Sequence, residues 1–296
     1  MYKKIYSILY FWIIFISVIS ANNKIVYLIS PPRSLSTVFL RMMQQRGDFF
    51  IFNEPSQSAF VAHYNPKLIS SLYKPNVPQS FLTVKEEIFK AAQHFNVFVK
   101  EMSFAIKNFL GQDIELMRHP DIYFIFLVRN PHHVIISFYN KQNTTAGFCV
   151  NYDLLSNLLS YQGLYELVHK IQQESVNKPL IMFAEDLYLN TETTIQVLCD
   201  HVGIDFKETS LVWDDLGNDF NGHEEWHENK LHSHTQHWHG DAIRSTGFKN
   251  PSSYEVDQEG IPTFSEIKDL DHRKICLAVY HENVPFYCLL KEAYAR

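Results

Sequence analysis

The chain has 296 residues, of which 46% are apolar and 20% are charged, and its formal net charge is −6 at neutral pH. These proportions are those of an ordinary globular protein and argue against wholesale disorder, and the length suffices for a sizeable core. The negative net charge argues against a nucleic-acid-binding protein, because such proteins normally present a basic face.

Residues 1–21 stand apart from the rest of the chain. Lys3 and Lys4 precede an apolar run over residues 5–20, and Ala21 follows it, which is the pattern of a secretory signal peptide. The run is short for a membrane span, although as an uncleaved anchor it would attach the protein to a membrane. A leader indicates a secretory or membrane-associated protein, whereas a misassigned start of translation would indicate a cytoplasmic one. We assign residues 22–296 to a single folded domain.

Five apolar stretches of strand length follow, each nearly continuous in hydrophobicity, as in strands that are buried on both faces. They occupy residues 24–30, 49–53, 96–100, 121–128 and 179–183. Helical patterns separate them at residues 35–46, 80–94, 131–140, 152–174 and 190–201. Strands that alternate with helices predict an α/β fold of three layers, with a mostly parallel central sheet and helices on both of its faces.

Charged residues follow the predicted strands at the point where each strand ends. Arg33 follows the first strand, Glu54 the second and Arg129 the fourth, while Lys100 ends the third. Ligands of parallel sheets collect at the carboxyl ends of the strands. Three cations and a carboxylate at one edge of the sheet therefore predict an anion-binding site.

The turn over residues 30–37, SPPRSLST, joins a predicted strand to a predicted helix, as a phosphate-binding loop does. Such a loop presents backbone N–H groups at the positive end of the helix dipole. Arg33 can bind two oxygens of an oxyanion, and Ser34, Ser36 and Thr37 add donors. The glycines and lysine of GxxxxGK[ST] are missing, which argues against a magnesium-dependent nucleoside triphosphatase. The alternative is an ordinary helix that Ser34 caps, with Arg33 in solvent.

Together with FNEP at residues 52–55 and the pair Arg129 and Ser137, this loop resembles that of the sulfotransferases that use 3′-phosphoadenosine 5′-phosphosulfate (PAPS). The resemblance is closest to P-loop sulfotransferase-like proteins with a PRSLST loop, and it covers most of residues 24–250. It implies direct in-line transfer of a sulfuryl group from PAPS to a hydroxyl or amine, with no metal required. The acceptor it implies is a small molecule or a glycan.

The same resemblance implies where the donor binds. Residues 33–37, which are Arg33, Ser34, Leu35, Ser36 and Thr37, would hold the 5′-phosphosulfate, although many members carry a lysine at the position of Arg33. Arg129 and Ser137 would hold the 3′-phosphate. Their spacing of eight residues lets a strand-end guanidinium and a hydroxyl on the next helix converge on one phosphate. A late basic loop with Gly247 and Lys249 would cover the nucleotide.

Glu54, Lys100 and Arg33 are the predicted catalytic residues. Sulfuryl transfer needs a base for the acceptor proton and cations for the leaving phosphate, so positioning and electrostatics can carry it. Glu54 suits the base, because Pro55 biases it toward an extended conformation at the sheet edge. The alternatives are that Glu54 caps the helix beginning at Pro55, or that a histidine is the base. Lys100 would stabilise the bridging oxygen, unless it is a solvated strand-end lysine.

A histidine-rich segment at residues 223–239 supports a rival class. Six imidazoles could bind zinc or copper, as in a metal-binding protein or a metallohydrolase. They are His223, His227, His232, His234, His237 and His239. The segment has no HExxH, and a helical and loop segment rich in polar aromatics, folded over the active site, explains it equally well, so we predict no metal ligand. A third class is a nucleotide-binding member of the fold without turnover.

Segments 56–80 and 141–165 are expected to line the acceptor pocket, and the oligomeric state stays open.

Overall fold

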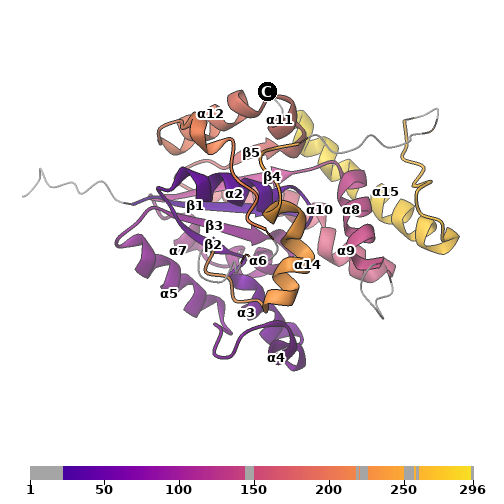
Figure 1. Ribbon diagram of the computed structural model, residues 1–296, viewed down its shortest axis with the longest axis horizontal. Helices are drawn as coiled ribbons and strands as arrows, with labels where there is room; N and C mark the ends of the chain where they lie inside the picture. Colours follow the sequence, from indigo (N-terminus) through magenta and orange to yellow (C-terminus); the bar gives the residue numbers. More distant parts are fainter. Residues whose placement is uncertain are drawn as a thin grey trace, which may run out of the picture.

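The structure is a computed structural model that describes residues 23–143, 150–217, 226–249 and 260–294, together with Phe220 and Asp257 (Figure 1). The leader or anchor predicted at residues 1–21 lies outside the described residues. Within the described ranges, no helix has both the length and the apolarity to cross a membrane.

Five parallel strands form a single sheet in the order β2-β3-β1-β4-β5. Their bounds are Ile25–Ser30 (β1), Phe50–Asn53 (β2), Val97–Met102 (β3), Ile122–Val128 (β4) and Leu180–Phe183 (β5). All five predicted strands are confirmed, and each begins one residue later than predicted. Only β3 ends elsewhere: it runs two residues further than predicted, so Lys100 lies within the strand and not at its end.

Helices cover both faces of the sheet, because successive strand residues point to opposite sides. Val26 and Leu28 pack with the helices of one face, namely α2 (Ser36–Arg46), α11 (Ala184–Leu189), α12 (Thr191–Val202) and α14 (His232–Ile243). Tyr27 and Ile29 pack with those of the other, namely α5 (Phe81–Ala92), α6 (Ser103–Leu110), α7 (Ile114–Met117), α8 (Pro131–Asn143), α9 (Tyr152–Leu159), α10 (Tyr161–Glu174) and α15 (Leu270–Tyr294). The predicted three-layer architecture is confirmed.

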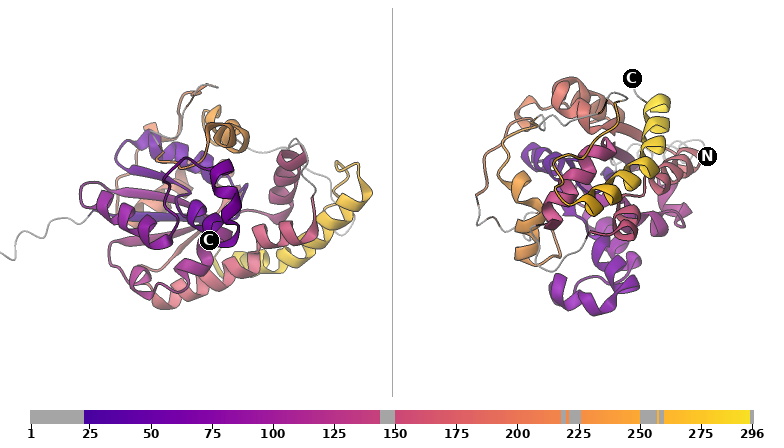
Figure 2. Two further views of the ribbon diagram at one scale, coloured as in Figure 1. Left: turned by 90° about the horizontal axis from the view of Figure 1, so that it is seen from below. Right: turned by 90° about the vertical axis from the view of Figure 1, so that its right-hand side faces the viewer.

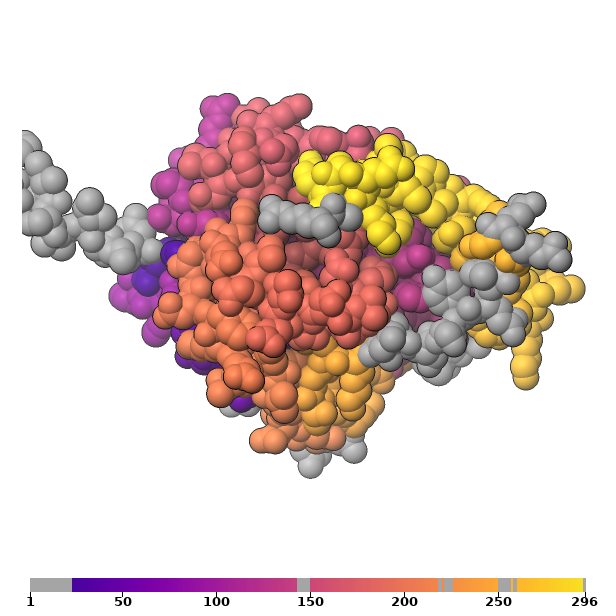
Figure 3. Space-filling view, turned by 90° about the horizontal axis from the view of Figure 1, so that it is seen from above, coloured from indigo at the N-terminus to yellow at the C-terminus, as the bar shows by residue number. Residues whose placement is uncertain are grey.

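The remaining elements lie at the edges of these layers. They are α3 (Ser56–Tyr64), η1 (Pro66–Leu68), α4 (Ile69–Leu72) and η2 (Glu208–Ser210). Figure 2 shows α10 and α15 side by side along the length of the molecule, and α15 also contacts α8 and α9. Figure 3 shows the opposite face, where the orange segment that follows α12 lies at the surface.

The prediction of one helix over residues 152–174 is wrong, because two helices occupy this range. Ser160 separates α9 from α10 with a φ of 26°, a value that an α-helix cannot contain. The side-chain carbonyl of Asn283 accepts a hydrogen bond from the N–H of Tyr161 at 2.8 Å and so satisfies the start of the second helix.

Arg41 ties α14 to α2 from a buried position. Its Nη1 donates to the carbonyl oxygens of Ile243 at 2.5 Å and Ala242 at 3.2 Å, and its Nη2 donates to that of Asp214 at 2.6 Å. A cation at the last turn of a helix also offsets the negative end of its dipole. We expect Arg41→Leu to lower the free energy of unfolding by about 2–4 kcal/mol, measured by urea denaturation, because buried carbonyls lose their donors.

Arg118→Leu is the matched control for this prediction. The Arg118 side chain is 63% exposed and pairs with Glu174, and a surface ion pair of this kind contributes about 0–1 kcal/mol. Equal losses of stability in the two variants would contradict the role assigned to Arg41.

Candidate functional site

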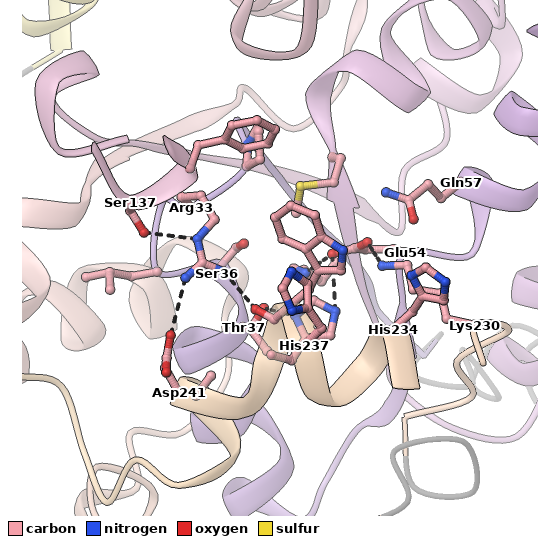
Figure 4. A pocket seen from close by; sticks show the side chains of 18 of the residues that line it. Arg33, Ser36, Thr37, Glu54, Gln57, Ser137, Lys230, His234, His237 and Asp241 are labelled. Carbon is pink, nitrogen blue, oxygen red and sulfur yellow. Dashed lines mark hydrogen bonds and ion pairs between the residues drawn. The ribbon is translucent and has the colours of Figure 1, made fainter. Parts of the chain in front are cut away.

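A cleft of about 1060 Å³ lies at the carboxyl edge of the sheet, between the loop after β1 and helix α14 (Figure 4). The structure brings almost all of the predicted site residues to this cleft. Those that line it are Arg33, Leu35, Ser36, Thr37, Glu54, Lys100, Arg129, Ser137, Gly247 and Lys249. Ser34 is the exception, since it is fully buried beneath the loop and does not line the cleft.

The loop between β1 and α2 has an unusual backbone. Arg33 and Leu35 adopt left-handed conformations, with φ of 62° and 64°, which are uncommon for residues other than glycine and cluster at functional sites. Among the described residues, no side chain caps α2, so Ser34 is not the helix cap of the alternative interpretation. The first N–H groups of a helix have no intrahelical acceptor. The start of α2, where Ser36 and Thr37 line the cleft, is therefore suited to an anion.

Arg33 and Arg129 follow the neighbouring strands β1 and β4 and contact each other. Arg129 Nη1 donates to the carbonyl oxygen of Arg33 at 2.7 Å, and Arg33 Nε donates to Ser137 Oγ at 3.0 Å. Arg33 Nη2 also lies 3.5 Å from Asp241 Oδ2. Burial, aided by the like charge of Arg129, lowers the pKa of Arg33 although Asp241 opposes this. An anion in the cleft would offset this concentration of positive charge.

Glu54 lies at the centre of a buried charged cluster. Its side chain forms ion pairs with Lys100 through Oε1 and with Lys230 through Oε2. It does not cap a helix, because α3 begins at Ser56 and the carboxylate is held by the two lysines. Burial alone would raise the pKa of Glu54, but attraction to Lys100 and Lys230 outweighs it and holds this pKa well below its usual range.

The two lysines differ from each other in their electrostatic surroundings. Burial lowers the pKa of Lys100 below its ordinary value. Burial also disfavours the charged form of Lys230, but Glu54 and Glu228 together raise the pKa of this group. Lys100, which is fully buried, therefore binds its proton less strongly than Lys230 does.

His239 connects this cluster to the anion loop. Its Nδ1 lies 3.2 Å from Thr37 Oγ1, and its Nε2 lies 3.4 Å from Glu228 Oε1 and 3.9 Å from Glu54 Oε1. Glu228 in turn accepts hydrogen bonds from Asn53 Nδ2 at 3.0 Å and from Thr235 Oγ1 at 2.8 Å. Burial lowers the pKa of His239 below its ordinary value although Glu228 opposes this, which favours the neutral imidazole.

Backbone pairing places Lys230 and Glu228 beside β2. The N–H of Asn53 donates to the carbonyl oxygen of Trp226 at 2.9 Å, and the N–H of Leu231 donates to that of Leu72 at 3.1 Å. These bonds join segments that are more than 150 residues apart in sequence. Sequence reasoning missed Lys230, Glu228 and His239 as site residues, and their only local signal was the histidine-rich segment that contains them.

The imidazoles of that segment are spread over different surroundings. His223 lies outside the described residues. The ring of His227 stacks on Phe50 with centroids 3.9 Å apart, while His234 and His237 line the cleft. In the part of the chain that the structure describes, no three His, Cys, Asp or Glu side chains form a group that could hold a metal ion.

The chain is an α/β protein whose parallel sheet carries a helix start without a side-chain cap, two arginines and a buried carboxylate at its carboxyl edge, an arrangement suited to an anion. A family model described as "Sulfotransferase domain" matches residues 24–261. The chain belongs to this sulfotransferase family, which confirms the family predicted from the PRSLST loop.

Curated relatives cover most of the chain. It is 27% identical over 268 residues to the branched-chain-amino-acid aminotransferase-like protein 2 of Arabidopsis thaliana, over 87% of this chain and 41% of that protein. It is 26% identical over 241 residues to the corresponding protein 1, over 79% of this chain and 38% of that protein. The chain thus spans about two fifths of the length of these relatives.

Sulfotransferases of known structure are more distant in sequence. The enzyme from Alicyclobacillus acidocaldarius has a TM-score of 0.46 at 10% identity, over 66% of this chain and 87% of that one. The sulfotransferase domain of the Synechococcus PCC 7002 olefin synthase has a TM-score of 0.43 at 15% identity, over 88% and 96% of the two chains. Mouse sulfotransferase SULT7A1, complexed with PAP, has a TM-score of 0.38 at 13% identity, over 64% and 62%.

Proposed function

We propose that this domain transfers a sulfuryl group from PAPS to a hydroxyl or amine acceptor. The observation that carries the proposal is the contact between Arg129 and the loop at Arg33, beside the uncapped start of α2. A donor with anionic groups at both ends of an adenosine needs two adjacent anion sites, and the ends of β1 and β4, which pair in parallel, would supply them.

The donor's two anionic ends would bind to different parts of this edge. The N–H groups at the start of α2, with Ser36, Thr37 and Arg33, would hold the 5′-phosphosulfate. Arg129 and Ser137 would hold the 3′-phosphate. Gly247 and Lys249, which line the same cleft from the segment after α14, would cover the nucleotide.

Glu54 would act as the general base and Lys100 as its electrostatic partner. In one in-line step, the acceptor oxygen or nitrogen bonds to sulfur while the bond from sulfur to the bridging phosphate oxygen breaks. The acceptor proton passes to Glu54, and adenosine 3′,5′-bisphosphate leaves. An incoming sulfonate gives Lys100 a second anion to bind, which weakens its hold on Glu54 and raises the proton affinity of the carboxylate. Cationic side chains would therefore offset the charge that a metal offsets in phosphoryl transfer.

Nucleotide binding and transfer test this proposal together. We expect adenosine 3′,5′-bisphosphate to raise the melting temperature more than adenosine 5′-phosphate or ATP does, with or without Mg²⁺. We also expect label to pass from [³⁵S]PAPS to hydroxyl or amine acceptors. A larger shift with ATP and Mg²⁺ would contradict the proposal. Binding of the bisphosphate without transfer to any of a broad acceptor panel would instead indicate the non-catalytic member of the fold.

A further inference from the structure

One part of the cleft is lined by apolar side chains and not by charged ones. We name it the apolar compartment and define it by the side chains that line it from β3, α3, η1, α4, α6 and α9. They are Phe60, Val61, Leu68, Leu72, Met102, Phe104, Leu154 and Leu158. The compartment begins next to Glu54, because α3 starts at Ser56 and packs on α6, which packs on α9.

These side chains face the cleft, although Met102 is buried and Leu158 also packs against the core. On α9, Leu155 and Leu159 are fully buried in the core beneath the sheet, whereas Leu154 and Leu158 lie on the neighbouring stripe of the helix and line the cleft. Phe60 and Phe104 meet edge to face, with ring centroids 5.3 Å apart, and form an aromatic wall. Apolar surface of this extent next to a reactive group is stabilised by a ligand that removes it from water.

Two polar groups at the border of the compartment already have partners. Tyr73 Oη donates to Gln57 Oε1 at 3.1 Å, and Glu54 is paired with Lys230 (Figure 4). A sugar would have to bury several hydroxyl groups against the carbon of this wall, and a buried hydroxyl without a hydrogen-bond partner costs free energy. A molecule with one hydroxyl at the end of an apolar skeleton meets no such penalty.

We propose that the acceptor is an apolar alcohol, with its skeleton in the apolar compartment and its single hydroxyl at Glu54. The inference rests on the proposed function for the hydroxyl chemistry, and it narrows the acceptor from a small molecule or glycan to a hydrophobic one. Sulfation would then convert an apolar alcohol and PAPS into an amphiphilic sulfate ester and adenosine 3′,5′-bisphosphate.

The test is a series of unbranched primary alcohols from butanol to octanol, with glucose and glycerol for comparison. Each buried methylene is expected to raise kcat/KM for sulfation about threefold to fourfold until the compartment is filled. The same series should stabilise the complex with adenosine 3′,5′-bisphosphate against heat in the same order. Leu158→Asn should weaken the dependence of both kcat/KM and thermal stabilisation on chain length. Leu154→Asn provides a second variant should the first fold poorly.

Leu189→Asn is the matched control. Leu189 is 63% exposed on α11 and is not among the described residues that line the cleft, so both dependences on chain length should be retained. Equal use of glucose and octanol, or no dependence on chain length, overturns the apolar acceptor while transfer itself still upholds the proposed function. Stabilisation that grows with chain length, in a protein that never transfers sulfate, upholds the apolar ligand and overturns the proposed function.

Discussion

Replacing Glu54 with glutamine is expected to slow sulfuryl transfer by about 100- to 10,000-fold, the range typical of a lost general base. Glutamine keeps the size of the side chain but cannot accept the acceptor proton. The affinity for adenosine 3′,5′-bisphosphate should change little, because the groups proposed to bind it lie on the loop at residues 33–37 and at Arg129. Steady-state transfer from PAPS and calorimetry with the bisphosphate measure the two quantities.

Glu228→Gln is the matched control, since it makes the same substitution in the same buried cluster. Glu228 contacts His239, Lys230, Asn53 and Thr235. If His239 were the base and Glu228 oriented it, Glu228→Gln would lose at least as much transfer as Glu54→Gln does. A small loss in Glu228→Gln and a large one in Glu54→Gln identifies Glu54, and unchanged transfer in Glu54→Gln excludes it. Thermal unfolding of each variant separates these outcomes from loss of folded protein, because Glu54→Gln leaves Lys100 and Lys230 buried beside a neutral group.

The pH dependence of transfer supports the same distinction. The pKa of Glu54 is held well below its usual range, so its carboxylate is ionised at every pH above that lowered value. Acidification from about pH 8 to about pH 5 should therefore leave Glu54 of the free enzyme ionised and cause little loss of kcat/KM, which reports the free enzyme. Burial lowers the pKa of His239, and this imidazole would lose its function as a base on acidification through that lowered pKa. A fall in kcat/KM over this acid range would thus point to the imidazole.

The sequence was most informative where a local pattern determines the structure. Strands that are buried on both faces have no polar face, so their continuous apolar runs locate them within a residue or two. Parallel strands also bring their carboxyl ends to one edge, which is why Arg33, Glu54 and Arg129 could be assigned to a shared cleft before its geometry was known. Fold and anion site are both consequences of this simple topology.

Long-range pairing determines the rest of the site, and no local pattern encodes it. Lys230 reaches Glu54 because residues 226–231 are bonded to Asn53 and Leu72, far away in the sequence. A helical and loop segment was expected at residues 223–239, but the bounds of α14 could not be predicted, because its sequence, HSHTQHWHGDAI, has little apolar periodicity. Its position depends on Arg41, which binds its last turn. The histidine-rich segment therefore suggested a metal site, whereas the structure uses one of its imidazoles to join Thr37 to Glu228.

Replacing Arg129 with alanine is expected to weaken the binding of adenosine 3′,5′-bisphosphate about 10- to 100-fold and that of adenosine 5′-phosphate much less. The reason is that a charge-assisted hydrogen bond to phosphate contributes about 1.5–3 kcal/mol, and only the bisphosphate carries the phosphate that Arg129 would bind. Arg129→Lys should lie between the wild type and the alanine variant, because lysine keeps the charge but loses the planar pair of donors. Calorimetry with both nucleotides gives the two affinities directly.

Arg118→Ala is the matched control, because Arg118 precedes β4 and Arg129 follows it, so the two arginines stand at opposite ends of one strand. Arg118 is largely exposed and pairs with Glu174, and its loss should leave both nucleotide affinities unchanged. If Arg129→Ala weakened the binding of the two nucleotides equally, Arg129 would not bind the 3′-phosphate. It would then act only by donating to the carbonyl of Arg33 and holding the loop, a role that both nucleotides need alike. The difference between the two affinities, and not the loss of either one, therefore decides whether the ends of β1 and β4 form one site for a doubly anionic donor.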